Sequence, residues 1–158
     1  MSVETSDHTS LATIALTTDV ATAATQLATA IGEQPVVTPY AAVGDCKAGS
    51  TYQWGGLQLS NANPFQPQDD LIGAWVNSGK TAMGIDIVTT GYQHIGAQLT
   101  DVLTQVPGAK QANNGVLLDL QTDPKLGDWG VLLVKNSSGT ASAIEDPSFG
   151  GAHGGCAG

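Results

Sequence analysis

An internal repeat is the feature of this sequence that most constrains its fold. The stretch LTTDVATAATQLATAIGEQP aligns without a gap with the later stretch VTTGYQHIGAQLTDVLTQVP. With three residues inserted, QWGGLQLSN then aligns with DWGVLLVKN, so that Trp54 meets Trp129. Self-similarity at a nearly constant offset is the mark of a duplicated structural unit. The sequence therefore predicts two related halves, residues 10–62 and residues 82–146.

The first half has the pattern of a strand that leads into a helix. Residues 10–16, SLATIAL, alternate in the manner of a strand, and Asp19 follows as a helix N-cap. Apolar residues then recur at helical spacing, and Gly32 is placed to end the helix. We expect a narrow, alanine-rich helix face that packs closely on a sheet.

The second half repeats this plan and adds strands. Residues 81–88 alternate as a strand, and a helix with one apolar side is expected to end at Pro107-Gly108. Three strands should follow, and the last two should be joined by the turn Asn136-Ser137-Ser138-Gly139. They are expected at residues 116–120, 129–134 and 140–145.

The whole pattern predicts one α+β domain over residues 1–158, because a chain of this length is near the usual size of a single domain. Residues 63–80 are interpreted as a linker between the halves. Residues 150–158 are interpreted as a glycine-rich tail.

Charge excludes several classes of partner. The net charge is −9, and the five cationic residues are all lysine. The phosphate-neutralising surface that nucleic-acid binding needs is therefore not expected, and anionic membranes are disfavoured for the same reason. The first residues carry no positive charge and lead into no apolar run of the kind found in secretory signals, so a cytoplasmic location is expected.

The stretches SLATIALTTDVATAATQLATAIG, AMGIDIVTTGYQHIGAQLTDVL and EDPSFGG together resemble the vicinal oxygen chelate superfamily of glyoxalases, bleomycin-resistance proteins and extradiol dioxygenases. The resemblance covers most of the chain loosely. It implies two βαβββ modules whose sheets form a half-open barrel around a ligand cavity.

The departures from this family concern the metal. Metal-using members commonly offer a histidine from the first strand of a module, and the matching positions here are Ala12 and Gly84. Neither side chain can bind a metal. The resemblance therefore implies the metal-free branch, whose members sequester small molecules, often antibiotics, as dimers. No cofactor is expected, and a homodimer is a possible partner arrangement.

Three residues are candidates for holding the ligand. Trp54 and Trp129 occupy matching positions in the repeat, so in a pseudo-symmetric barrel they would stack on a flat ligand. Asp86 alternates with the apolar residues of its predicted strand, which places its carboxylate on the cavity face. Core packing of the tryptophans and a solvated strand face for Asp86 are the alternatives. The expected ligand is a small aromatic or cationic molecule.

A second resemblance is to papain-like cysteine hydrolases, carried by GVLLDLQTDPKLGDWGVLLVKNSSGTASAIEDPSFGG. It implies Cys46 as the nucleophile and Asp146 as the orienting carboxylate. Asp128 stands where the family has its histidine, so this resemblance implies an inactive relative unless His153 substitutes. A metal-dependent lyase, isomerase or dioxygenase of the first fold is a further alternative. A structural subunit of a virion or surface assembly is the last alternative, and only the Thr/Ala/Gly-rich composition favours it.

Overall fold

The computed structural model describes residues 2–4, 9–15, 17–42, 47–61, 72–89, 93–123 and 127–149. The helices are α1 (Val20–Ile31) and α2 (Leu99–Gln105). The strands are β1 (Ser2–Glu4), β2 (Ser10–Thr13), β3 (Val36–Tyr40), β4 (Gly49–Trp54), β5 (Leu57–Asn61), β6 (Ile72–Val76), β7 (Lys110–Ala112), β8 (Gly115–Asp123), β9 (Gly127–Lys135) and β10 (Ala141–Phe149).

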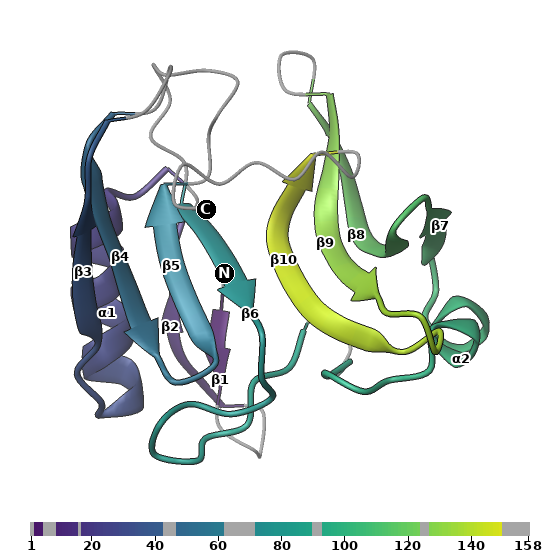
Figure 1. Ribbon diagram of the computed structural model, residues 1–158, viewed down its shortest axis with the longest axis horizontal. Helices are drawn as coiled ribbons and strands as arrows, with labels where there is room; N and C mark the ends of the chain where they lie inside the picture. Colours follow the sequence, from purple (N-terminus) through teal and green to yellow (C-terminus); the bar gives the residue numbers. More distant parts are fainter. Residues whose placement is uncertain are drawn as a thin grey trace. The chain divides into compact units, whose positions relative to one another are not determined.

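Eight of these strands form one open antiparallel sheet in the order β3-β4-β5-β6-β10-β9-β8-β7 (Figure 1). The remaining strands, β1 and β2, form a separate antiparallel pair. The predicted α+β class is confirmed. Within the described residues, neither helix is long and apolar enough to span a membrane.

The chain is organised as two compact units. The first holds β1, β2, α1, β3, β4 and most of β5. The second holds Gly55–Leu57, the last three residues of β6, α2, and β7 to β10. Along the chain each helix is followed by four described strands, whereas three were expected. One of the additional strands, β6, lies in the stretch that was interpreted as a linker.

Helix α1 forms where the sequence predicts it. The Asp19 carboxylate accepts a hydrogen bond from the backbone N–H of Thr22 at 3.0 Å, which satisfies one of the free donors of the first turn. Gly32 ends the helix in the left-handed conformation, with φ of 71°. The helix packs near β1 and β2. Its buried side combines three alanines with two larger apolar residues and consists of Val20, Ala23, Ala24, Leu27 and Ala28.

Helix α2 is shorter than the apolar spacing predicts, because tertiary hydrogen bonds compete for the start of the predicted helix. Gly96 has φ of 92°, which no right-handed helix allows, and its N–H donates to the Ala141 carbonyl at 2.8 Å. The N–H of Leu99 donates to the carbonyl of Gly139 at 3.1 Å. The helix therefore begins only at Leu99 and ends at Gln105.

The strand predicted over residues 81–88 is wrong. Gly84 has φ of 86° and its N–H donates to the Thr81 carbonyl at 3.0 Å, which closes a local turn. The N–H of Ile87 donates to the Gly79 carbonyl at 2.9 Å. These backbone groups are satisfied inside the segment rather than by a neighbouring strand, so the alternating apolar residues do not mark a buried face.

The last three predicted strands and their turn are confirmed, as β8, β9 and β10. Asn136 organises the turn, because its side-chain oxygen accepts the N–H groups of Ser138 and Thr140 at 2.9 and 3.0 Å. The core of the second unit lies between α2 and one face of these strands. It consists of Val76, Leu99, Val102, Val116, Leu118, Val131, Leu133, Ala141 and Ile144.

Candidate functional site

Two adjacent carboxylates lie on β10, which is an interior strand between β6 and β9. Glu145 and Asp146 are both half-buried. Placing carboxylates at partly buried positions of an interior strand costs free energy unless they are compensated. Such a departure from an apolar pattern points to function.

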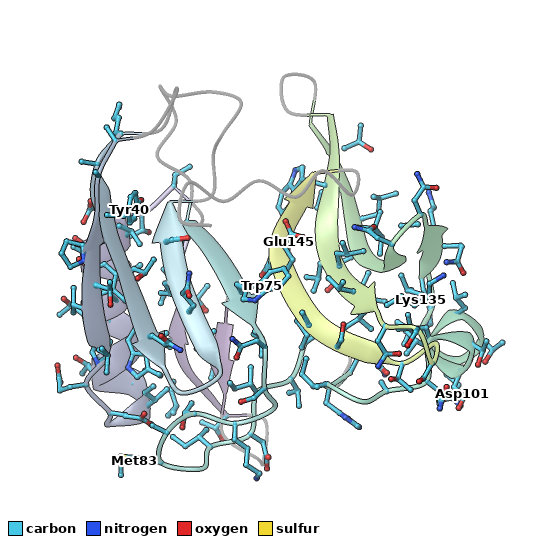
Figure 2. All side chains as sticks on the ribbon, viewed as in Figure 1. Tyr40, Trp75, Met83, Asp101, Lys135 and Glu145 are labelled. Atoms are coloured by element: carbon cyan, nitrogen blue, oxygen red, sulfur yellow. The ribbon has the colours of Figure 1, made fainter. Side chains whose placement is uncertain are left out.

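Trp75 stands directly opposite Glu145 across the pair formed by β6 and β10. On the other side of β10, Glu145 is opposite Leu132, which is completely buried. Side chains directly opposite in an antiparallel pair have their Cβ atoms about 4.5–5.5 Å apart. Figure 2 shows Trp75 and Glu145 on these neighbouring strands. A half-buried indole and a half-buried carboxylate therefore share one face of the sheet.

The strands on both sides of β9 bulge at the same level. On β8, three residue steps from Leu118 to Gln121 match two steps on β9, from Val131 to Trp129. On β10, three steps from Glu145 to Ser148 match two steps on β9, from Leu132 to Gly130. β8 therefore carries one extra residue opposite Gly130, and β10 carries one opposite the adjacent Val131. Bulges of this kind re-aim side chains and occur frequently next to active sites.

An aspartate occupies each bulge. Asp119 on β8 has φ of 49°, the left-handed conformation that Asp tolerates better than most residues. Asp146 lies in the bulge of β10. Gly130 is required between them, because a Cβ at this position would lie 2.5 Å from the Leu118 carbonyl oxygen.

Burial is the main cause that raises the pKa of Asp146 above its ordinary value of 3.8, and the Asp119 carboxylate contributes only a small increase. A site of this kind favours a ligand that brings positive charge or hydrogen-bond donors. The candidate site thus consists of Trp75 and Glu145, contributed by β6 and β10, and Asp146 and Asp119 lie in the bulges of β10 and β8.

Trp54 and Asp86, which the sequence predicts as ligand-binding residues, lie outside this site. Trp54 ends β4, is completely buried, and donates its indole N–H to the Glu33 carbonyl at 2.8 Å. Its ring is thus accounted for as part of the core. Asp86 is 73% exposed in the loop before α2, where it pairs with Lys80 at 2.6 Å. The predicted strand that would have aimed its carboxylate into a cavity is absent.

Trp129 lies near the start of β9 and is half-buried. Its strand partners are Gln121 on β8 and Phe149 on β10. The two tryptophans that align in the sequence therefore occupy different places in their strands: Trp54 precedes a tight turn, whereas Trp129 belongs to a continuous strand.

Of the three residues proposed for a cysteine hydrolase, the structure describes only Asp146. Cys46 and His153 lie outside the described residues. Asp146 is on β10, as described above. The two positions matched to metal-binding histidines are Ala12 on β2 and Gly84 in the turn of residues 81–84. No group of three or more His, Cys, Asp or Glu that could hold a metal occurs among the described residues.

Sequence reasoning missed Trp75, Glu145 and Asp119. Trp75 stands in a stretch interpreted as a linker, although the run LIGAWV around it is apolar enough for a strand. Asp119 interrupts the apolar run GVLLDL, and such an interruption is a signal for a bulge. Comparison of the chain with protein-family models, with curated proteins and with solved structures found no match.

Proposed function

We propose that this chain is a metal-free binding protein for a small cationic ligand with an aromatic part, and that Trp75 and Glu145 hold this ligand. The observation that carries the proposal is the pairing of these two half-buried side chains across β6 and β10. An aromatic ring face attracts a cation within about 6 Å of its centre, and a neighbouring carboxylate strengthens this attraction.

The charge of the whole chain supports a cationic ligand. A net charge of −9 creates a field that concentrates cations near the surface and repels anions. Asp146 and Asp119 add two further carboxylates within the same three strands. Sequestration, rather than catalysis, is the activity that these residues support, because they supply charge and apolar surface.

Titration with three benzene derivatives tests this proposal. Benzylamine, benzyl alcohol and phenylacetate share a ring and differ in charge, and binding is followed by calorimetry and by tryptophan fluorescence. Benzylamine should bind best and quench fluorescence, phenylacetate should bind least, and the affinity for benzylamine should fall as salt rises.

Substitutions then locate the site. Glu145→Gln should weaken benzylamine binding roughly tenfold, and Trp75→Phe should remove the fluorescence response. Asp101→Asn is the matched control, because it removes the same charge from an exposed position on α2. Equal affinity for the three compounds, or equal losses in Glu145→Gln and Asp101→Asn, would contradict the proposal.

We also propose that the two halves descend from one duplicated module, with a half-open barrel as its arrangement. The support for duplication is the recurrence of one order, a helix followed by four antiparallel strands. An experimental structure tests this proposal: α1 with β3, β4 and β5 should superpose on α2 with β7, β8 and β9. Failure of that superposition would contradict it.

A further inference from the structure

Strand β3 forms one edge of the eight-stranded sheet (Figure 1). In the part of the chain that the structure describes, β3 pairs with β4 and with no other strand. The pairing is regular from Val36, opposite Gln53, to Tyr40, opposite Gly49, and it contains no bulge. The regular outer side of β3 is therefore a place where a further strand could add to the sheet.

The sequence of this edge favours pairing with another strand. Val36 and Val37 are 68% and 51% exposed, and both are β-branched residues of the kind enriched in strands. Residues 34–44 carry no charge, although the whole chain has a net charge of −9. Exposed, apolar and uncharged segments with high strand propensity are the ones that pair with other chains. Charge therefore does not protect this edge.

The hydrogen bonding of β3 shows which backbone groups point away from β4. In an antiparallel pair, the N–H and C=O of one residue point to the same side, and successive residues alternate between the two sides. The Thr51 hydroxyl donates to the Thr38 carbonyl at 3.3 Å, so the backbone groups of Thr38 point toward β4. Those of Val37 and Pro39 consequently point toward the open edge.

One of these two outward positions cannot donate a hydrogen bond. Proline has no N–H, and its ring fills the space where the carbonyl of an added strand would have to approach. Within sheets, proline is confined largely to edge strands in which the missing N–H would face solvent. Pro39 occupies such a position. Val37 is then the only residue within β3 that offers an outward N–H.

The opposite edge of the sheet has other features that hinder strand addition. Strand β7 is only three residues long and begins with Lys110. Short edge strands, lysine residues and bulges are common means of preventing edge-to-edge pairing. Strand β3 is longer, uncharged and regular, so it has none of these features. Proline is the one such feature that it carries.

We propose that Pro39 blocks the β3 edge, and that without this proline the edges of two chains pair with each other. Amide hydrogen exchange of the wild-type chain tests the geometry. The amides of Thr38 and Tyr40 point toward β4, so the outward amide of Val37 should exchange at least roughly tenfold faster than either. A Val37 amide as protected as that of Thr38 would mean that another segment already pairs with this edge, and it would overturn the proposal.

Replacing the proline tests the block itself. Pro39→Thr restores an outward N–H and adds a residue with high strand propensity. In about 0.3 M NaCl, which screens the repulsion between acidic chains, the variant should form larger assemblies at a protein concentration at least roughly tenfold below that needed by the wild type. Sedimentation velocity measures this difference. Pro107→Thr is the matched control, because it makes the same substitution at an exposed position outside the strands.

A second substitution locates the association on β3. Pro39→Thr with Val36→Asp should sediment as the wild type does, because each edge then carries a carboxylate that repels the other. Pro39→Thr with Leu11→Asp is its control and should still associate, since Leu11 is 50% exposed on β2, outside the eight-stranded sheet.

Thermal unfolding shows whether each variant is folded, and the midpoint of Pro39→Thr should stay near that of the wild type. A Pro39→Thr chain that has lost its fold would show that the proline serves the stability of β3 instead, and it would overturn the proposal. Equal sedimentation of Pro39→Thr and Pro107→Thr, or equal behaviour of the two double variants, would overturn it as well.

Discussion

Asp146 combines a position in a β-bulge with a raised pKa. It lies in the bulge of β10, it is half-buried, and burial and the Asp119 carboxylate raise its pKa. The folded chain therefore binds this proton more tightly than the unfolded chain does. The contribution of Asp146 to stability is complete below pH 3.8 and is lost as the pH rises through the higher pKa of the folded state.

Replacing Asp146 with Asn should therefore make the protein more stable at neutral pH relative to the wild type. The relative gain should be smallest well below pH 3.8, where the wild-type carboxyl is protonated in both states. Thermal unfolding of the two proteins at several pH values measures this difference. Asp101→Asn is the charge-matched control, because it removes an exposed carboxylate and keeps Asp146. A parallel pair of curves for Asp146→Asn and wild type would falsify the assignment.

Single residues also show which information about the predicted ligand residues the sequence does not contain. The alignment of Trp54 with Trp129 is visible in the sequence, but it carries no information about which ring is buried. The hydrogen bond from Trp54 to the Glu33 carbonyl joins residues 21 positions apart, and only the folded chain brings them together. The pairing of Trp75 with Glu145 is likewise a matter of strand register over 70 positions.

Among the helices and strands, those whose ends are set by neighbouring residues in the sequence could be predicted. The N-cap of α1 and its terminal Gly32 depend on neighbouring residues, and the helix forms between them. Helix α2 and the segment of residues 77–89 depend on contacts that are distant in the sequence. Gly96 donates to Ala141, and Gly56 donates to Lys80, so apolar spacing alone misjudged both segments.

The paired bulges beside Gly130 make a prediction at the scale of strands. Gly130→Ala would place a Cβ against the Leu118 carbonyl oxygen, so that β8 must shift relative to β9. We expect a loss of about 1–3 kcal/mol in the free energy of unfolding, as for other forced overpacking. Gly79→Ala is the control, because its Cβ would meet open space. Urea unfolding measures both variants, and equal stabilities would show that β8 adapts without cost.

The bulge variant also bears on the proposed site. The shift of β8 should carry Asp119 away from Asp146, so the pKa of Asp146 should fall slightly in Gly130→Ala, while burial keeps it above its ordinary value. Nuclear magnetic resonance of the Asp146 side-chain carboxyl carbon follows this titration directly. A pKa that is unchanged in Gly130→Ala would mean that Asp119 keeps its position when the strands move.

At the scale of the whole molecule, the dominant property is acidity: 14 carboxylate residues face five lysines, and one of these lysines is paired with Asp86. Repulsion among the remaining negative charges opposes the compact state. Because the screening length is about 10 Å at 0.1 M salt, the midpoint of thermal unfolding at pH 7 should rise between roughly 0.01 M and 0.3 M NaCl.

The same salt increase should have little effect near pH 4.3, where the net charge approaches zero. The partly buried Asp146 is screened less than the exposed carboxylates, so its contribution to the pH dependence should persist at high salt. Comparison of wild type and Asp146→Asn at both salt concentrations therefore separates the two effects. A salt response at pH 7 no larger than that near pH 4.3 would show that repulsion among surface charges does not limit the stability of this fold. In that case, the pH dependence of the unfolding midpoint that persists at both salt concentrations comes from buried groups. If this pH dependence disappears in Asp146→Asn, it comes from the Asp146 carboxyl.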